Sequence, residues 1–147
     1  MILETQIKCY DFYKINNDNG LLEYVDATYI LHLENNGRIN NIIEQIKIYN
    51  ITQVIYILFN KGYKNCDKGE RVNFSLTDLI DANIKVFEHA KNNNFTNILV
   101  LEDDFFFNPI TKDKFTLNNV NNFLSKFKTK KFIYALGCSP WIYLPYD

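Results

Sequence analysis

A short apolar run that ends in three consecutive acids constrains this chain more than any other stretch. Ile98 to Leu101 is unbroken and rich in branched side chains, and Glu102, Asp103 and Asp104 follow it directly. An apolar run of this length predicts a strand buried on both faces, as in a parallel sheet covered by helices. The acids would then stand at the carboxyl edge of the sheet, where open α/β folds bind ligands.

The three acids predict a cation site. Because side chains alternate along an extended segment, Glu102 and Asp104 are expected on one side and Asp103 on the other. Two neighbouring carboxylates repel each other, and a divalent cation such as Mg²⁺ or Mn²⁺, itself holding phosphate oxygens, would balance their charge. The alternative is a strand that stops in a solvated acidic turn, and these residues alone favour neither interpretation.

The composition of the 147 residues is that of one globular domain. Hydrophobic residues make up 47% and charged residues 22%, which is ordinary for a soluble protein. The formal net charge of −1 gives no long-range attraction to nucleic acid or to anionic membranes. We therefore expect no nucleic-acid partner. No apolar stretch reaches the length of a membrane span, so none is expected.

The cysteines and the N-terminus bear on the compartment. Cys9, Cys66 and Cys138 are widely spaced and odd in number, and no CxxC or Cys/His cluster is present. This pattern argues against a structural zinc site and against a disulfide scaffold, and it favours a reducing environment. The N-terminus, with Glu4 early and no apolar core, does not resemble a signal peptide. The expected location is the cytoplasm.

Apolar segments rich in β-formers predict the strands of the sheet. Two of them flank the first expected helix, and a third follows the last expected helix. A further edge strand is expected near the N-terminus, before a turn-forming cluster of Asn and Gly. Besides the acidic strand, the expected strands are Ile7–Ile15, Ala27–Leu33, Gln53–Phe59 and Lys131–Leu136.

Three segments between the strands have apolar residues at the spacing of one helix face. The second begins with Ser75-Leu76-Thr77-Asp78, which resembles a capping box with Asp in place of Glu, and Thr116 can cap the third. Strand-helix-strand repeats predict right-handed parallel crossovers, and hence an open, mostly parallel, doubly wound α/β sheet in one domain, 1–147. The residues expected to face the core are Ile39, Ile42, Ile43 and Ile46 in the first helix, Leu76, Ile80, Ile84 and Phe87 in the second, and Leu117, Val120, Leu124 and Phe127 in the third.

Polar side chains lie where the expected strands end. His32-Leu33-Glu34 closes the first core strand and Asn60-Lys61 follows the second. If the first and the acidic strand are neighbours, a nucleotide base could pack at the first strand while its diphosphate reaches the metal. Each residue also has a structural interpretation: Arg38 as a surface side chain, His32 as a buried core histidine and Asp78 as a helix cap.

Residues 60–73 form a polar loop that is longer than most connections, which often marks a functional loop. Its cations, Lys61, Lys64, Lys68 and Arg71, could close over phosphates. A solvated surface explains them as well, and the loop composition favours that interpretation.

No serine-hydrolase, P-loop or glycine-rich dinucleotide signature is present. Four segments, in the same order and with similar spacing, resemble the family 25 glycosyltransferases, which build lipopolysaccharide and modify collagen hydroxylysine. The matching segments are Tyr29–Glu34 with Arg38 (family "INL…R"), Asn73–Leu79 ("GCxLSHL"), Ile98–Asp104 ("LILEDD") and Phe132–Gly137 ("DLLYLG"). The acidic triad is the most specific of them.

This resemblance implies a GT-A nucleotide-sugar fold and a metal-dependent transfer of sugar from a UDP- or GDP-linked donor to a hydroxyl of a glycan or protein acceptor. Glu102, Asp104 and Asp103 would hold Mn²⁺ or Mg²⁺, which would act as a Lewis acid on the departing diphosphate. The nucleotide contacts that the resemblance implies are His32, Leu33, Glu34, Arg38, Asn60, Thr77, Asp78 and Leu101.

The chain departs from the family in several places. His32 replaces an Asn, Asp78 replaces a His, and Arg38 lies one residue closer to its strand. Only Cys138–Asp147 follow the last motif, where GT-A enzymes carry much of the acceptor site. The short form also resembles compact glycosyltransferases of large DNA viruses, which would place it in the host cytoplasm.

Two other function classes remain open. One is a non-catalytic, truncated module that binds a nucleotide sugar without transferring it. The other is a Toprim-like phosphotransfer domain, in which Glu34 would join the later acids around Mg²⁺. The near-neutral charge and the lack of a basic stripe weigh against the second.

Overall fold

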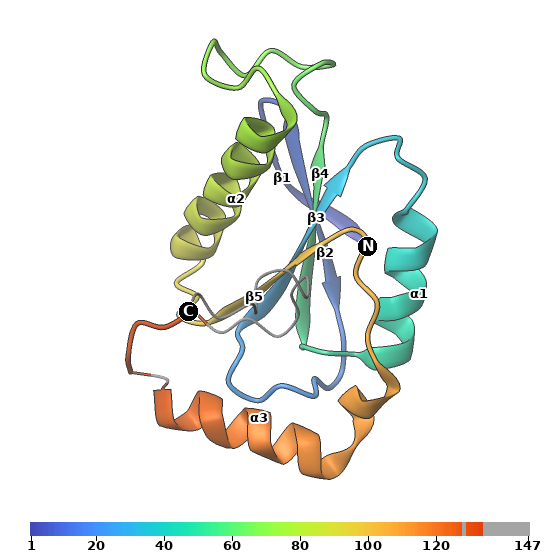
Figure 1. The fold of residues 1–147 in the computed structure, drawn as a ribbon, viewed down its shortest axis with the longest axis vertical. Helices are drawn as coiled ribbons and strands as arrows, with labels where there is room; N and C mark the ends of the chain where they lie inside the picture. Colours follow the sequence, from blue (N-terminus) through green and yellow to red (C-terminus); the bar gives the residue numbers. More distant parts are fainter. Residues whose placement is uncertain (128, 134–147) are drawn as a thin grey trace, which may run out of the picture.

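The computed structural model describes residues 1–127 and 129–133, and their strands form one five-stranded sheet (Figure 1). The strands are β1 (Ile2–Ile7), β2 (Tyr10–Asn16), β3 (Ala27–Leu33), β4 (Val54–Asn60) and β5 (Ile98–Glu102). Their order is β1-β2-β4-β3-β5. β3 is parallel to β4 and β5, whereas β2 is antiparallel to β1 and β4. The sheet is therefore mixed, and not mostly parallel as the sequence suggested.

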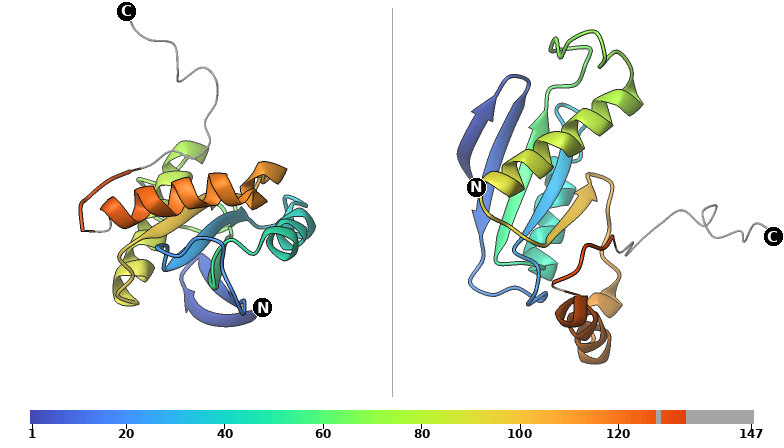
Figure 2. Two further views of the ribbon diagram at one scale, coloured as in Figure 1. Left: turned by 90° about the horizontal axis from the view of Figure 1, so that it is seen from below. Right: turned by 90° about the vertical axis from the view of Figure 1, so that its left-hand side faces the viewer.

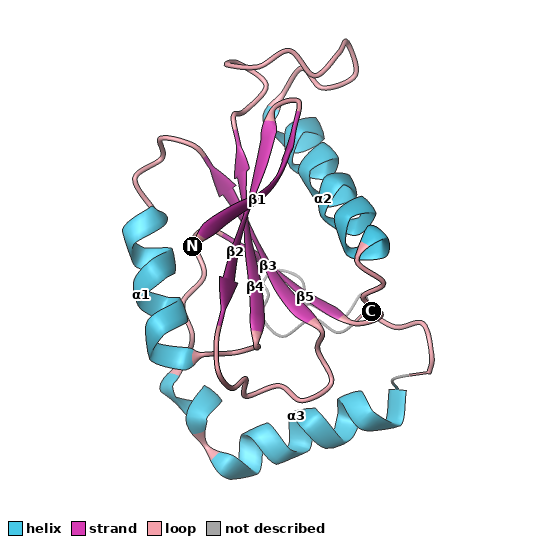
Figure 3. Cartoon of the chain, turned by 180° about the vertical axis from the view of Figure 1, so that it is seen from behind, coloured by secondary structure: helices cyan, strands magenta, loops and turns pink. Residues whose placement is uncertain are grey.

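In the described part of the chain, two helices link the parallel strands and two follow the last one. They are α1 (Ile39–Tyr49), α2 (Ser75–Asn92), the short 3₁₀ helix η1 (Pro109–Lys112) and α3 (Lys114–Phe127). α1 connects β3 to β4, and α2 connects β4 to β5. Figures 1 and 3 show α1 and α2 on opposite faces of the sheet, with α3 running across its lower end.

The side chains of β3 are buried on both faces of the sheet. Ile30 packs with Ile42 and Ile46 of α1. Its neighbours Tyr29 and Leu31 point the other way and share a core with α2. Since consecutive residues of a strand alternate between faces, one strand supplies both layers of the core. The doubly wound arrangement expected from the sequence is thus confirmed for the parallel part of the sheet.

The strand order places the predicted ligand edge where the sequence expected it. β3 lies between β4 and β5, and the connections through α1 (β3 to β4) and through α2 (β4 to β5) run on opposite faces, so the chain switches direction beside β3. The carboxyl ends of the three parallel strands, Leu33, Asn60 and Glu102, therefore meet at one edge. Such a switch point leaves a crevice outside the strand ends.

The prediction for α1 was correct. Ile42 is fully buried and Ile46 nearly so, and Ile39 and Ile43 pack against the same cluster. The helix ends at Asn50, which adopts the left-handed conformation that Asn tolerates well.

The prediction for α2 was wrong. Leu76, Ile80, Ile84 and Phe87 are 45–58% exposed, and the buried face instead carries Asp78, Ala82, Val86, His89 and Ala90. Small and polar residues can face the core here because the polar ones find partners inside it. Hydrophobic spacing found the helix but selected the wrong face.

Two strand predictions also needed correction. The expected edge strand Ile7–Ile15 is a hairpin, because the chain reverses at Lys8 and Cys9, whose φ is positive. Its second arm, β2, lies inside the sheet. β5 is only half-buried, because within the described residues it pairs with β3 alone.

The last third of the chain follows the expected pattern in part. Leu124 of α3 is buried with Leu22, Tyr49 and Ile51 at the lower end of the sheet. α3 begins before Thr116, whose backbone N–H and hydroxyl both donate to Asp113. Residues 131–133 of the expected strand Lys131–Leu136 are irregular. The remainder of that segment and Cys138–Asp147 lie outside the described residues.

Cys9 and Cys66 form a disulfide, although the cysteine spacing argued against a disulfide scaffold. Sequence spacing missed this pair because the two residues are 57 positions apart and meet only when the loop after β4 folds against the hairpin. No described helix is long and apolar enough to cross a membrane.

Candidate functional site

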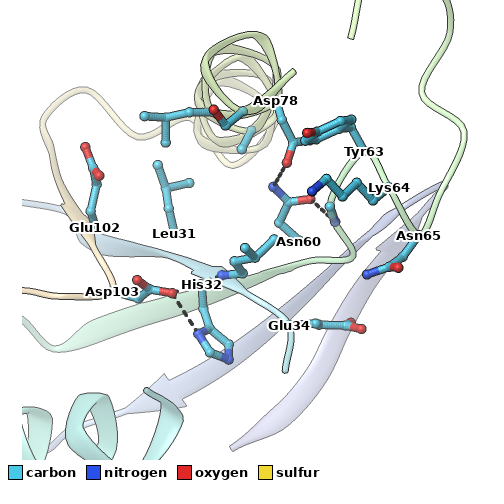
Figure 4. Close-up of a pocket in the computed structure, with 15 residues that line it drawn as sticks. Leu31, His32, Glu34, Asn60, Tyr63, Lys64, Asn65, Asp78, Glu102 and Asp103 are labelled. Atoms are coloured by element: carbon cyan, nitrogen blue, oxygen red, sulfur yellow. Dashed lines mark hydrogen bonds and ion pairs between the residues drawn. The ribbon is translucent and has the colours of Figure 1, made fainter. Parts of the chain in front are cut away.

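A pocket of about 500 Å³ opens at the carboxyl edge of β3, β4 and β5 (Figure 4). Its volume is within the usual range of small-molecule sites. The lining combines strand ends, the loop after β4 and the first turns of α2. Residues that matter for its chemistry are Leu31, Asn60, Tyr63, Lys64, Leu79 and Glu102.

Glu102 stands on the wall of this pocket. It pairs in register with Leu31, whose side chain faces α2, so the Glu102 side chain lies on the same side of the sheet. Figure 4 shows the two side chains next to each other. The carboxylate accepts no hydrogen bond from any described residue, so it is available to a ligand.

The Asp103 side chain points to the opposite side of the sheet, and both of its oxygens accept hydrogen bonds. Its Oδ1 accepts a hydrogen bond from Arg38 Nη1 at 2.7 Å. Its Oδ2 accepts from the Leu33 backbone N–H at 3.0 Å, from His32 Nδ1 at 3.1 Å and from the Asn36 side-chain amide. Asp103 is 6% exposed, and it ties β5 to the turn between β3 and α1.

These partners also set the charge state of Asp103. Burial alone would raise the pKa of the carboxyl group, but the hydrogen bonds from Arg38, Asn36, Leu33 and His32 outweigh it and lower the pKa. The same contact with Asp103, together with its charge, raises the pKa of Arg38. Asp103 is therefore ionised at neutral pH and held by donors, which leaves it unsuited to bind a metal.

Asp104 lies beyond the strand. β5 ends at Glu102, and the Phe105 N–H donates to the Glu102 carbonyl, so the chain turns here. The Asp104 side chain is 64% exposed and lies 3.7 Å from Arg38 Nη1. In the part of the chain that the structure describes, no three His, Cys, Asp or Glu side chains come together as a metal site.

A second anchored acid stands on the far wall of the pocket. Asp78 is 5% exposed, accepts a hydrogen bond from Asn60 Nδ2 at 3.1 Å and forms an ion pair with Lys68. It does not cap α2: the Thr77 hydroxyl bonds to the backbone of Phe74 instead. The expectation that Asp78 acts as the helix cap was therefore wrong.

Lys68, in the loop after β4, is buried. Its side chain is only 2% exposed, although the sequence favoured a solvated loop. Besides Asp78, its ammonium donates to Asn60 Oδ1 at 2.5 Å and to the Tyr10 hydroxyl at 2.7 Å. Tyr10 in turn donates to Asp81 at 2.5 Å, and burial is the main cause that raises the pKa of its hydroxyl. Together with the disulfide, Lys68 holds the loop against the sheet.

The other expected nucleotide contacts divide into two groups. Leu33, Glu34, Asn60 and Asp78 line the pocket, whereas Thr77, Leu101 and Arg38 do not. His32 also contributes to the lining, but its side chain is 3% exposed, bonded to Asp103 and edge-on to Phe59. The core interpretation of this histidine fits its surroundings.

The ionisable groups leave the pocket wall negative. Arg38 balances Asp103 and Lys68 balances Asp78. Of the charged residues in the lining, Glu34, Glu102 and Lys64 remain, which gives a net negative charge. An anionic ligand would be repelled by this wall unless a cation accompanied it.

Sequence reasoning missed three residues that build this site. Asn36 and Lys68 hold the two anchored acids, and Tyr63 extends the wall from the loop. Asn36 belongs to a turn cluster and Lys68 to a run of surface-like cations, so neither had a distinguishing signal.

No family model matches the chain, and no curated protein or solved structure matches it either.

Proposed function

We propose that this chain is a metal-dependent glycosyltransferase that binds a nucleoside-diphosphate sugar in the pocket at the carboxyl edge of β3, β4 and β5. The observation that carries the proposal is the position of Glu102 on the wall of a ligand-sized pocket at a doubly wound switch point. The resemblance of four segments to family 25 glycosyltransferases, in the right order, supports the same activity.

The available carboxylate suits a cation that shares its ligands with phosphate. Mg²⁺ is commonly held by one or two protein carboxylates and completes its shell with water and substrate phosphates. Glu102, with no hydrogen-bond partner among the described residues, can supply one such ligand from the pocket wall. Asp104 is exposed but lies outside the pocket lining, 3.7 Å from Arg38 Nη1. Asp103 cannot supply a ligand, because donors occupy both of its oxygens.

The residues around the pocket have separate tasks in this proposal. The bound cation would neutralise the diphosphate as it leaves the sugar. The apolar wall of Leu31 and Leu79 would shield the nucleoside from water, and Lys64 would add positive charge at the loop side. Asp103 would act as a positioning residue, because its bonds fix the turn from which Glu102 and Asp104 extend.

A second candidate is binding without transfer. It is favoured by one observation: both deeply buried acids of the pocket, Asp78 and Asp103, are saturated by donors and are poor general bases. The Toprim-like alternative has no such support. Glu34 and Glu102 lie on opposite sides of His32 in Figure 4, so they do not form one acidic cluster.

Calorimetric titration with UDP- and GDP-sugars, with and without Mn²⁺, tests the proposal. We expect binding that requires the cation and that weakens at least about tenfold in Glu102→Gln, a loss of about 1.4 kcal/mol. Glu44→Gln, an exposed acid of α1, is the matched control and should bind normally.

Product analysis then separates the two candidates. Slow release of free sugar or transfer to an acceptor, abolished by Glu102→Gln, would establish the enzyme. Cation-dependent binding with no turnover would establish the binding module. If no sugar nucleotide binds in either condition, the proposed ligand is wrong.

A further inference from the structure

One side of α2 presents an apolar surface that no other described part of the chain covers. Leu76, Ile80, Ile84 and Phe87 lie on one face of the helix, and their exposed fractions are between 45% and 58%. We call these four residues the α2 stripe. An apolar surface of this kind on a soluble domain commonly marks a place where another segment packs.

The C-terminal end of the α2 stripe lies next to the start of β5. Phe87, near the end of the stripe, lines a cleft together with Phe95 and with Ile98 of β5. The flank of the helix that carries Asp81 faces the hairpin, because Asp81 accepts the hydrogen bond of Tyr10 in β2. The cleft at Phe87 joins the end of the stripe to the start of β5, and we call the stripe and this cleft together the groove.

We propose that residues 134–147 of this same chain occupy this groove, covering the α2 stripe and the cleft at the start of β5. Nine of these fourteen residues are apolar or aromatic, and Asp147 is the only charged one. A segment with this composition is stabilised by packing on an apolar surface, because the contact removes apolar side chains of both from water. It includes Trp141, the single tryptophan of the chain.

The end of the described chain lies in the right place for this segment. Figures 1 and 2 show the stretch after α3 rising from the lower end of the sheet, on the side of β5 away from β3. Fourteen extended residues reach about 45 Å. The 18 residues of α2 span about 27 Å. The segment can therefore cover the whole stripe.

Attachment to the same chain favours this occupant over a second copy. A tethered segment is present at an effective concentration of roughly millimolar, far above that of a separate protein in dilute solution. The described chain also ends at Ile133, whose side chain is fully exposed and contributes nothing to the core.

Fluorescence of Trp141 in the full chain tests the proposal, because no other tryptophan contributes. We expect a blue-shifted emission that acrylamide quenches weakly. Ile84→Asp should shift the emission to the red and raise the quenching constant roughly twofold or more, since the indole loses its apolar contacts. Ile48→Asp is the matched control: Ile48 on α1 is 43% exposed, against 45% for Ile84, but faces away from the groove.

Cys138 offers a second measurement, because the other two cysteines are paired with each other. Under mild oxidation Ile84→Cys should form a disulfide with Cys138 inside one chain, and Ile48→Cys should not. Solvent-exposed Trp141 in the unmodified chain, or equal effects of Ile84→Asp and Ile48→Asp, would overturn the proposal. A cross-link between two chains, or a dimer by light scattering that Ile84→Asp dissociates, would assign the groove to a second copy instead.

Discussion

The two helices that cover the sheet were predicted by the same reasoning and behave differently. α1 buries the apolar residues that its periodicity selects, with Ile42 fully buried. α2 exposes its apolar residues and buries His89 and Asp78. The layer under α1 is a plain aliphatic core, whereas the layer under α2 combines aromatic rings with an ion pair and a buried histidine.

Apolar periodicity therefore indicates which residues of a helix could be buried. The surrounding structure decides which of them are. Under α1 the sheet offers apolar side chains, mainly isoleucines such as Ile30, Ile55 and Ile57, so the apolar stripe is the best match. Below α2 the sheet offers Tyr10, Tyr29 and Asn60, whose polar groups require partners. The polar face of α2 supplies them.

The largest effect is expected from breaking the ion pair below α2. Lys68→Met leaves Asp78 charged, buried and without its cation, and should lower the free energy of unfolding by about 3–5 kcal/mol. Urea unfolding followed by circular dichroism measures the loss. The double variant Lys68→Met/Asp78→Asn removes both charges and should recover much of it; no recovery would mean that the pairing of charges is not what Lys68 provides.

The next effect compares one isoleucine from each helix. Ile42→Ala empties a fully buried site under α1 and should cost about 3 kcal/mol. Ile84→Ala removes a side chain that the described residues leave 45% exposed. If the described residues alone surrounded it, the cost would stay below about 1 kcal/mol. Because we propose that residues 134–147 cover the α2 stripe, we expect a larger cost that still lies below that of Ile42→Ala. A cost under about 1 kcal/mol would count against that covering.

The smallest effect is a pH dependence that belongs to α2 alone. His89 stacks on Phe12, its Nδ1 faces the Tyr29 hydroxyl at 2.8 Å and its Nε2 lies 3.4 Å from Glu4. Burial lowers the pKa of His89 below its ordinary value of 6.5, although Glu4 partly opposes this shift. The folded protein therefore holds a neutral imidazole where the unfolded chain takes up a proton.

The sign follows from this difference in proton uptake. Below about pH 6.5 the unfolded chain binds more protons, so stability falls as the pH decreases, until the lower pKa of the folded state is reached. Urea unfolding between pH 7.5 and pH 5, a range chosen to bracket this window, should show the decline. His89→Gln should flatten it and Ile42→Ala should not. Asp103 adds nothing in this range, because its pKa lies below the ordinary value for Asp.

The elements of the parallel sheet could be predicted from local sequence. Ala27–Leu33 is β3 as expected, Gln53–Phe59 differs from β4 by one residue at each end, and the acids do follow β5 at the carboxyl edge. α1 and its buried face were also predictable. Each of these features depends on residues within one strand or one helix turn of each other, where spacing and propensity determine the outcome.

The chemistry of the site was predictable only in outline. Glu102 was found because a run of acids after an apolar strand is a local pattern, and it does line the pocket. The partners of Asp103 could not be found, since Asn36 and Arg38 are more than 60 residues away and meet it only across the β3–β5 pair. The Cys9–Cys66 pair and the buried Lys68 escaped detection for the same reason.

Local sequence patterns were enough to locate β3, β4, β5 and the main helices, and to show that three acids follow β5. Contacts between distant segments set which of these acids is anchored, which face of α2 is buried and which cysteines pair. They do so because a carboxylate, a lysine or an isoleucine has the same local propensity in either role. Its burial and charge state depend on partners that distant segments bring to it.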